Sequence, residues 1–139
     1  MLDLVYALLI TYNAPGAVPA KQLAKAIVEV ANHYHEDPIL VTQLIIVESR
    51  GKAHAYNSDT QDYGIMQLNM TTIVEMKLNK NRLFDWRYNL NAGVRRLHNL
   101  RKNIDFRPCA WNTGIKGMKK YPKTCDKYER KLTSIGGLL

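Results

Sequence analysis

The sequence predicts a mainly α-helical fold with a cleft and at most a small β hairpin. Two observations lead to this prediction. Apolar residues recur at helical spacing in several segments, and helix-capping or turn residues separate these segments. The 139 residues are 46% apolar and 23% charged, which is typical of a soluble globular protein with one core. No apolar stretch reaches the length of a membrane span.

The apolar run at residues 4–10 has two interpretations, a signal peptide or a first helix that packs on the domain. Residues 14–17, Ala-Pro-Gly-Ala, follow the run. Asp3 is the only charged side chain before it, and a signal peptide would have Lys or Arg there. We therefore expect residues 1–19 to form an N-terminal arm or helix and residues 20–139 to form the main domain.

Two helices are expected at the start of the main domain. Pro19 suits the first turn of a helix, and the apolar residues after it recur at helical spacing until the helix ends near His33. Asp37 is a good N-cap and Pro38 a good first helical residue. A second helix should therefore run from Pro38 to Glu48.

The middle of the chain is expected to contain a loop and a short helix. Residues 51–62 are polar and rich in turn residues, so they should form a loop that includes at most a short hairpin. Asn69 or Thr71 is suited to cap a helix that continues to Met76. Residues 79–81, Asn-Lys-Asn, should interrupt the helical pattern.

A long helix is expected at residues 86–102, because one of its faces is marked by Leu90, Val94, Leu97 and Leu100. Gly93 lies inside this helix, where a glycine costs stability. It therefore predicts close packing against another helix.

Two shorter helices should complete the chain. One is expected before Asn112, with Thr113 and Gly114 ending it. The other should run over residues 124–134 and stop at the glycines 136–137, since glycine commonly ends helices.

Glu48 is the leading candidate for a catalytic residue. It follows the apolar residues 39–47, and burial of this helix would desolvate the carboxyl group and raise its pKa. A carboxylic acid that stays protonated near neutral pH can act as a general acid. The alternative is a helix-end Glu whose side chain turns outward into water.

Three segments that follow one another along the chain resemble the signatures of one family. They are Glu48-Ser49, Gly64-Ile65-Met66-Gln67 and Ala110-Trp111-Asn112-Thr113-Gly114. The soluble lytic transglycosylase catalytic domain, a lysozyme-like domain, typically has Glu-Ser, Gly-Leu-Met-Gln and Ala-Tyr-Asn-x-Gly. Tyr128 resembles the late tyrosine that lies beside the catalytic Glu in that family. The resemblance runs over about residues 20–132, and goose-type lysozymes share much of the pattern.

The departures from this family pattern are small. Ile65 replaces Leu and Trp111 replaces Tyr, and both keep the shape and the apolar character. The loop between Glu48 and Gln67 is slightly longer than typical.

The resemblance implies a lysozyme-like α+β fold, with residues 20–139 as the catalytic domain. It implies that the substrate is the glycan strand of peptidoglycan and that no cofactor is needed. Glu48 would protonate the oxygen between N-acetylmuramic acid and N-acetylglucosamine. As a base, it would then take the proton from the muramic 6-hydroxyl, which attacks C1 and forms a 1,6-anhydro sugar.

The resemblance also assigns substrate-binding roles to Ser49, Tyr63, Gly64, Ile65, Met66, Gln67, Trp111, Asn112 and Tyr128. Several of these have a structural alternative. Ser49 can satisfy the helix end, Gln67 can brace a loop, and Trp111 can pack in the core instead of stacking on a sugar. Tyr121 is a second candidate for the late tyrosine.

Two other functions are open at this point. Hydrolysis, as in lysozymes, would require a second carboxylate to activate water, and Asp59 and Asp62 lie in the loop after Glu48. Loop aspartates more often form turns or face solvent. The second alternative is a non-catalytic module that binds the cell wall.

The net charge of +8 predicts a surface that attracts polyanions. Lysines and arginines cluster towards the C-terminus, and the peptide carboxylates of peptidoglycan are suitable partners. Nucleic acid is not expected, because no nucleic-acid-binding motif accompanies the charge. Much of the charge is also compatible with ordinary solvated helix faces.

Cys109 and Cys125 flank one corner of the candidate site along the sequence. They can form a disulfide in an oxidising compartment or remain two buried free thiols. The histidines and cysteines show no zinc-ligand spacing, so no metal is expected. We expect a monomer that acts on the bacterial cell wall, in the periplasm or outside the cell. Without a standard signal peptide, delivery by a phage fits, as an endolysin or a virion-associated enzyme.

Overall fold

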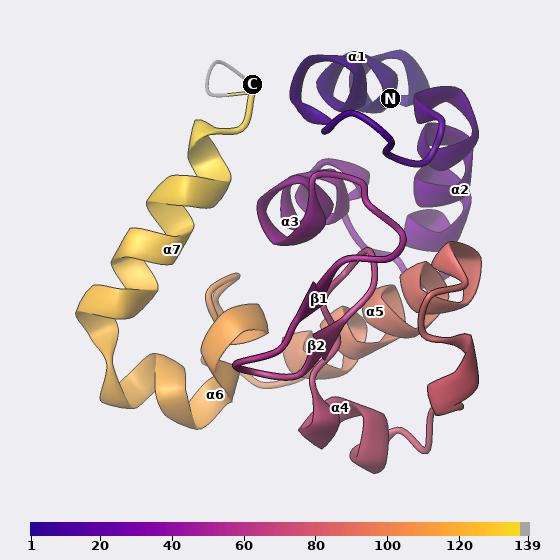
Figure 1. Ribbon diagram of the computed structural model, residues 1–139. Coiled ribbons are helices and arrows are strands. Elements are labelled where there is room, and N and C mark those ends of the chain that lie inside the picture. Colours follow the sequence, from indigo (N-terminus) through magenta and orange to yellow (C-terminus); the bar gives the residue numbers. More distant parts are fainter. Residues whose placement is uncertain (137–139) are drawn as a thin grey trace.

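Seven α-helices, a 3₁₀ helix and a two-stranded hairpin make up residues 1–136, the part of the chain that the computed structural model describes (Figure 1). In chain order they are α1 (Leu2–Tyr12), α2 (Ala20–His33), α3 (Pro38–Ser49), β1 (Tyr56–Asn57), β2 (Asp62–Tyr63), α4 (Met70–Glu75), η1 (Lys80–Arg82), α5 (Trp86–Arg101), α6 (Ala110–Lys120) and α7 (Pro122–Ser134). The prediction of a mainly helical fold with a small hairpin is confirmed. Among the described residues, no helix has the length and apolar character needed to cross a membrane.

The helix α3 lies at the centre of the molecule and contributes fully buried residues to the core. It contacts α1 and α2 on one side and α7 on another, and the hairpin lies below it in Figure 1. The side chains of Val41, Leu44 and Ile45 on α3 are fully buried. Because neighbours surround α3 so completely, a residue at its end is held partly out of water.

The N-terminal segment forms α1, whose Val5 and Leu9 are fully buried against the rest of the core. This helix packs on α2 and α3. The division of the chain after residue 19 stays a prediction.

The local signals for the next two helices are borne out. The helix α2 begins after Pro19 and ends at His33, as predicted. Asp37 caps α3, since its Oδ1 accepts a hydrogen bond of 2.8 Å from the backbone N–H of Ile39. The helix ends at Ser49, one residue later than predicted.

The loop after α3 contains the short hairpin, in which β1 and β2 pair antiparallel with Tyr56 opposite Tyr63. Asn69 proves to be the cap of α4 and accepts a hydrogen bond of 2.8 Å from the N–H of Thr72. The predicted break at residues 79–81 lies between α4 and α5, where Lys80–Arg82 form the 3₁₀ helix η1.

The long helix α5 begins at Trp86 as predicted, but the prediction for Gly93 was wrong about its partner. A Cβ atom at Gly93 would collide with the side chain of Met66, which belongs to the turn after β2 and not to a helix. The glycine therefore brings α5 close to the turn that carries the second signature segment.

The short helix that was expected before Asn112, with Thr113 and Gly114 ending it, begins later and extends further than predicted. The helix α6 begins at Ala110, so Asn112 lies within its first turn. Gly114 interrupts the helix with φ 70° and ψ 171°, as expected for a helix-ending residue, but the chain then resumes helical geometry to Lys120.

The last helix, α7, begins two residues earlier than predicted because Pro122 serves in its first turn. Gly136 follows it with φ 70°, in agreement with the predicted stop. Gly137, the other glycine of that prediction, lies outside the described residues.

Candidate active site

Glu48 lies in the last turn of α3, partly buried, and faces Tyr128 of α7. The hydroxyl of Tyr128 donates a hydrogen bond of 2.7 Å to Glu48 Oε1. Tyr128 itself is buried, whereas Tyr121, the other candidate for this position, is 53% exposed at the start of α7. The contact joins two residues that are 80 positions apart in the sequence.

The surroundings of Glu48 favour its protonated form. Desolvation by burial is the largest influence and raises the pKa of Glu48 above its ordinary value, while the hydrogen bond from Tyr128 lowers it in part. The negative charge of Asp62 raises it further, and the positive charges of Lys131 and Arg96 lower it. A carboxyl group in this environment is suited to donate a proton.

Tyr128 is fixed as the donor in this pair. Burial and the charge of Glu48 raise the pKa of the Tyr128 hydroxyl, so it remains protonated. Within residues 1–136, the second carboxyl oxygen of Glu48, Oε2, has no hydrogen-bond partner in the structure. One oxygen is therefore held by the tyrosine and the other is available to a ligand.

The second signature segment forms a tight turn in which backbone conformation explains the sequence. Gly64 has φ 79°, and a Cβ there would collide with the side-chain amide of Asn89, so only glycine fits. Ile65 and Met66 are fully buried. The side-chain amide of Gln67 donates hydrogen bonds of 3.0 Å to the carbonyls of Ala55 and Gly64, which braces the loop.

Asn89 on α5 organises this turn, although the sequence did not identify it as a site residue. Its Oδ1 accepts a hydrogen bond of 2.9 Å from the N–H of Met66. Its Nδ2 donates bonds of 2.9 Å to the carbonyls of Tyr63 and Leu83. One signal was available: Asn89 stands four residues before Gly93, so both lie on the same face of the predicted helix.

Ser49 joins the end of α3 to the same turn. Its hydroxyl donates a hydrogen bond of 2.7 Å to the carbonyl of Ile65 and accepts one of 3.2 Å from the N–H of Gly51. The side chain is buried. The bond between Ser49 and Ile65 fixes the neighbouring Glu48 relative to the turn.

The residues of the third signature segment differ in exposure. Trp111 is only 3% exposed, so its ring packs in the core, while Asn112 is exposed. The guanidinium of Arg96 lies 4.9 Å from the centre of the Trp111 ring. It also donates a hydrogen bond of 3.1 Å to the backbone carbonyl of Trp111. Arg96, also missed from the sequence, is partly buried, and this burial lowers its pKa.

The two loop aspartates occupy different environments. Asp59 is exposed, and Asp62 is partly buried at the start of β2, where it accepts a hydrogen bond of 2.6 Å from Thr60 Oγ1. Asp62 is the one whose charge acts on Glu48. It is therefore the better placed candidate for a second carboxylate.

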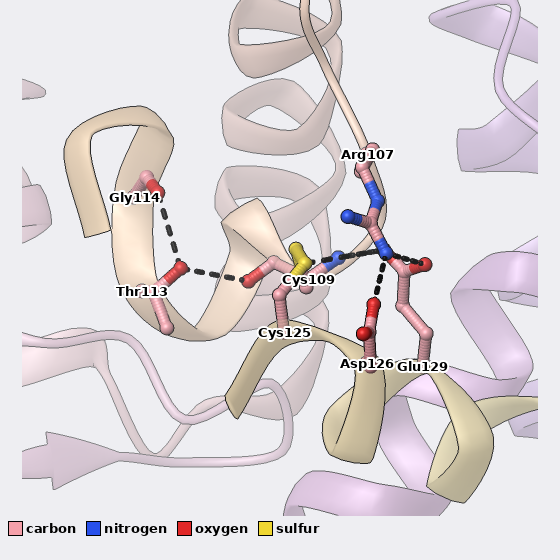
Figure 2. The surroundings of a disulfide bond; sticks show 7 residues. All are labelled: Arg107, Cys109, Thr113, Gly114, Cys125, Asp126 and Glu129. Carbon is pink, nitrogen blue, oxygen red and sulfur yellow. Dashed lines mark hydrogen bonds and ion pairs between the residues drawn. A yellow bond between two sulfur atoms is a disulfide. The ribbon is translucent and has the colours of Figure 1, made fainter. Parts of the chain in front are cut away.

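A disulfide between Cys109 and Cys125 ties the start of α6 to α7 (Figure 2). Beside it, Arg107 forms ion pairs of 2.9 Å with Asp126 and 2.8 Å with Glu129. Figure 2 shows Arg107 reaching both carboxylates next to the disulfide. Of the two states open from the sequence, the structure has the disulfide. Cys109, Cys125 and Glu129 bring three potential metal-ligand atoms together, but two of these are the bonded sulfurs.

Comparison with known protein families identifies a family that matches most of the chain. The family model described as "Transglycosylase SLT domain" matches residues 25–133, which reach from α2 into α7 and include Glu48 and Tyr128. Comparison with curated proteins gives no match.

Proposed function

Because the chain belongs to the family of transglycosylase SLT domains, we propose that it is a peptidoglycan lytic transglycosylase. The signature segments predicted this family, and the match over residues 25–133 confirms it. Membership of this family supports the proposal that the protein cleaves glycosidic bonds in peptidoglycan. We propose more specifically that the cleaved bond is the β-1,4 bond from N-acetylmuramic acid to N-acetylglucosamine, and that the product is 1,6-anhydro-N-acetylmuramic acid.

The observation that carries this proposal is the hydrogen bond between Tyr128 and Glu48 in a desolvated setting. Protonated Glu48 would donate its proton to the glycosidic oxygen as the bond from C1 to that oxygen breaks. Ionised Glu48 would then accept the proton of the muramic 6-hydroxyl while the oxygen of that hydroxyl forms a bond to C1. The proton is thus returned, no water is consumed, and one carboxyl group serves both steps.

The roles of the other candidates follow from their contacts. We propose that Ser49 and Gln67 position the loop beside Glu48, since their polar groups bind backbone carbonyls. Ile65, Met66 and Trp111, which are buried, would form the supporting wall, and Gly64 would allow the turn. Tyr63 and Asn112 retain accessible side chains and are the candidates for direct contact with the sugar.

Hydrolysis is the second candidate, and it is supported by the effect of Asp62 on Glu48. A carboxylate in this position could activate a water molecule as a base. In that reaction Asp62 would be required for activity, whereas in the transglycosylase reaction it would only influence the pKa of Glu48.

Mass spectrometry of the soluble products from purified peptidoglycan tests the proposal. We expect anhydro-muropeptides, which are lighter by one water than the products of hydrolysis. Glu48→Gln should lower their release by at least about 100-fold, because it removes the general acid. Products with reducing ends would instead assign hydrolysis. Binding without any release by the wild type would indicate a non-catalytic wall-binding module.

We further propose that the protein acts as a monomer outside the cytoplasm, where its substrate lies. Delivery by a phage, as an endolysin or a virion-associated enzyme, remains part of this proposal.

A further inference from the structure

Four cationic side chains surround a surface pocket that the proposed reaction does not use. The pocket has a volume of about 490 Å³, and its lining includes Lys77, Arg82, Arg87 and Arg95. Among the described residues, neither an Asp nor a Glu lines it. We call these four residues the cation cluster. Pockets of this size are typical of small-ligand sites in proteins, so the charge of this one indicates an anionic ligand.

The pocket lies on the side of α5 that faces away from the candidate active site. Asn89 and Gly93 approach the turn that contains Met66. Asn91, which lines the pocket, stands two residues after Asn89 and is therefore roughly 200° away around the helix. In Figure 1, α7 lies at the left, whereas the chain from α4 to the start of α5 lies at the bottom and right. The pocket is therefore separate from the surroundings of Glu48.

The members of the cation cluster come from three parts of the chain. Lys77 follows α4, Arg82 belongs to η1, and Arg87 and Arg95 belong to α5. Cations from separate elements can contact one ligand from different directions. A tetrahedral phosphate presents oxygens in several directions, whereas a carboxylate presents two oxygens in one plane. The arrangement therefore suits phosphate better than a single carboxylate.

The charge of the cluster is largely uncompensated. Within residues 1–136, Arg82 is the one member that forms an ion pair, at 3.3 Å from Asp85. The guanidinium of Arg82 lies 4.4 Å from the centre of the Tyr88 ring, and that of Arg87 lies 4.3 Å from the centre of the Trp86 ring. Such contacts orient a guanidinium and leave its N–H groups able to donate hydrogen bonds. A bound anion would also relieve the repulsion between these like charges.

Two polar side chains add hydrogen-bond donors to the pocket. Asn91 Oδ1 accepts a hydrogen bond of 3.2 Å from the hydroxyl of Tyr34, which leaves the amide N–H groups of Asn91 to donate. The hydroxyl of Tyr88 accepts a bond of 2.8 Å from the backbone N–H of Asn79, so its own proton is available. The pocket thus combines cations with neutral donors, which suits a ligand rich in acceptor oxygens.

We propose that the cation cluster binds a compact, multiply charged phosphate group, either a phosphomonoester or a pyrophosphate. A soluble phosphate compound and the headgroup of a phosphorylated lipid both present this chemistry. Nucleic acid fits less well, because its phosphates carry one charge each and are spread along a backbone, whereas these cations converge on one pocket. The inference does not rest on the proposed function, since phosphate binding at this pocket requires no cleavage of glycan.

Titration calorimetry at low salt with inorganic pyrophosphate tests this site, and citrate serves as a multiply charged probe that has only carboxylates. The wild type should bind pyrophosphate at least about fivefold more tightly than citrate, and pyrophosphate should raise the temperature of unfolding. Lys77→Gln combined with Arg95→Gln should weaken pyrophosphate binding by at least about tenfold, because it removes two of the four cations.

A matched control removes one lysine and one arginine elsewhere. Lys123→Gln combined with Arg130→Gln changes two exposed cations of α7, and both double variants lower the net charge from +8 to +6. The control should bind pyrophosphate as the wild type does. Arg95→Lys keeps the charge without the planar fork of donors, so its binding should lie between those of the wild type and the pocket double variant.

Vesicles distinguish the two sources of the phosphate group. Phosphatidylcholine vesicles with phosphatidic acid present a phosphomonoester, and vesicles with phosphatidylglycerol, matched in total charge, present a phosphodiester. Binding that prefers phosphatidic acid and is lost in the pocket double variant would assign a lipid headgroup. Binding of pyrophosphate at the pocket without binding to either vesicle would assign a soluble phosphate compound.

Four outcomes would overturn the site. They are unchanged pyrophosphate binding in the pocket double variant, an equal loss in the α7 control, binding of citrate as tight as that of pyrophosphate, and tighter binding of a short DNA duplex through the same four cations. Thermal unfolding of each variant without ligand shows whether a loss of binding reflects a loss of folded protein.

Discussion

The pKa of Glu48 is subject to opposing influences, each of which comes from an identifiable feature of the structure. Burial and the charge of Asp62 raise its pKa, and the hydrogen bond from Tyr128 lowers it. The tyrosine therefore has two roles that are difficult to distinguish by loss of activity alone. It orients the carboxyl group, and it limits how strongly the group holds its proton.

A pair of substitutions should shift the pH profile in opposite directions. A general acid must be protonated, so activity should fall as pH rises through the pKa of Glu48. Tyr128→Phe removes an influence that lowers this pKa, so the fall should move to higher pH, with a lower maximal rate. Asp62→Asn removes a charge that raises the pKa, so the fall should move to lower pH. The measurement is the rate of peptidoglycan solubilisation against pH.

Asp59→Asn is the matched control for this pair, because Asp59 is an exposed aspartate of the same loop. Its profile should coincide with that of the wild type. Shifts of Tyr128→Phe and Asp62→Asn in the same direction would contradict the account. Loss of activity in Asp62→Asn at every pH would favour hydrolysis with Asp62 as the second carboxylate.

The sequence identified some residues of the candidate site and missed others for a physical reason. Glu48 and Tyr128 were found from the signature segments, and the structure brings them together. Asn89 was missed because all its partners are backbone groups, two of them more than 20 residues away in the sequence. Backbone groups carry no mark in the sequence, so the only signal for Asn89 was its position on the same helix face as Gly93. Arg96 was missed because its contacts also depend on the fold.

At the scale of elements, the helices with local boundary signals were the predictable ones. The cap at Asp37 and the start at Trp86 agree with the structure because short-range contacts determine them. The helix α6 was not predictable, since helical geometry resumes after Gly114. In the resumed part of the helix Met118 is buried, and the disulfide at Cys109 joins the start of α6 to α7.

The disulfide should matter for activity through α7, which carries Tyr128. Cys109 and Cys125 are separated by 16 positions, and a bridge over a loop of this size contributes about 3 kcal/mol in the chain-entropy description. Replacing both cysteines by serine should lower the free energy of unfolding by about that amount, as measured in urea. Activity should also fall at temperatures where the protein is folded, because α7 holds Tyr128 less firmly against Glu48.

The Tyr128→Phe background shows whether the loss of activity acts through the tyrosine. In that background the hydrogen bond to Glu48 is already absent, so serine at both cysteines should cost clearly less activity than in the wild type. The loss of stability should be the same in both backgrounds. Equal losses of activity in the two backgrounds would mean that the disulfide affects the site by another route.

At the scale of the whole molecule, α6 and α7 carry a large share of the net charge of +8, as does α5, which has four arginines and no carboxylate. The helices α6 and α7 carry seven lysines and arginines but only two carboxylates. Both carboxylates, Asp126 and Glu129, are bound to Arg107. All seven cations are exposed, although Lys119 pairs with Asp105, so we expect α6 and α7 to give the molecule a positive side.

This positive side should speed encounter with anionic cell-wall material, and two triple variants with the same net charge test the idea. One replaces Lys116, Lys123 and Lys127 by Gln on α6 and α7, and the other replaces Lys21, Lys25 and Lys102 by Gln elsewhere. All six lysines are exposed, and each triple variant has a net charge of +5. The rate of binding to purified peptidoglycan at low salt should fall by about tenfold only in the first variant.

Salt dependence distinguishes the position of the charges from their number. Added salt screens exposed charges, so it should slow binding by the wild type and by the second variant much more than binding by the first. If the binding rate of both variants fell equally at low salt, the net charge alone would determine the rate of encounter. The positions of the lysines on α6 and α7 would then not matter. If only the first variant bound more slowly and with less dependence on salt, the protein would approach the cell wall with the side of the molecule that also positions Tyr128.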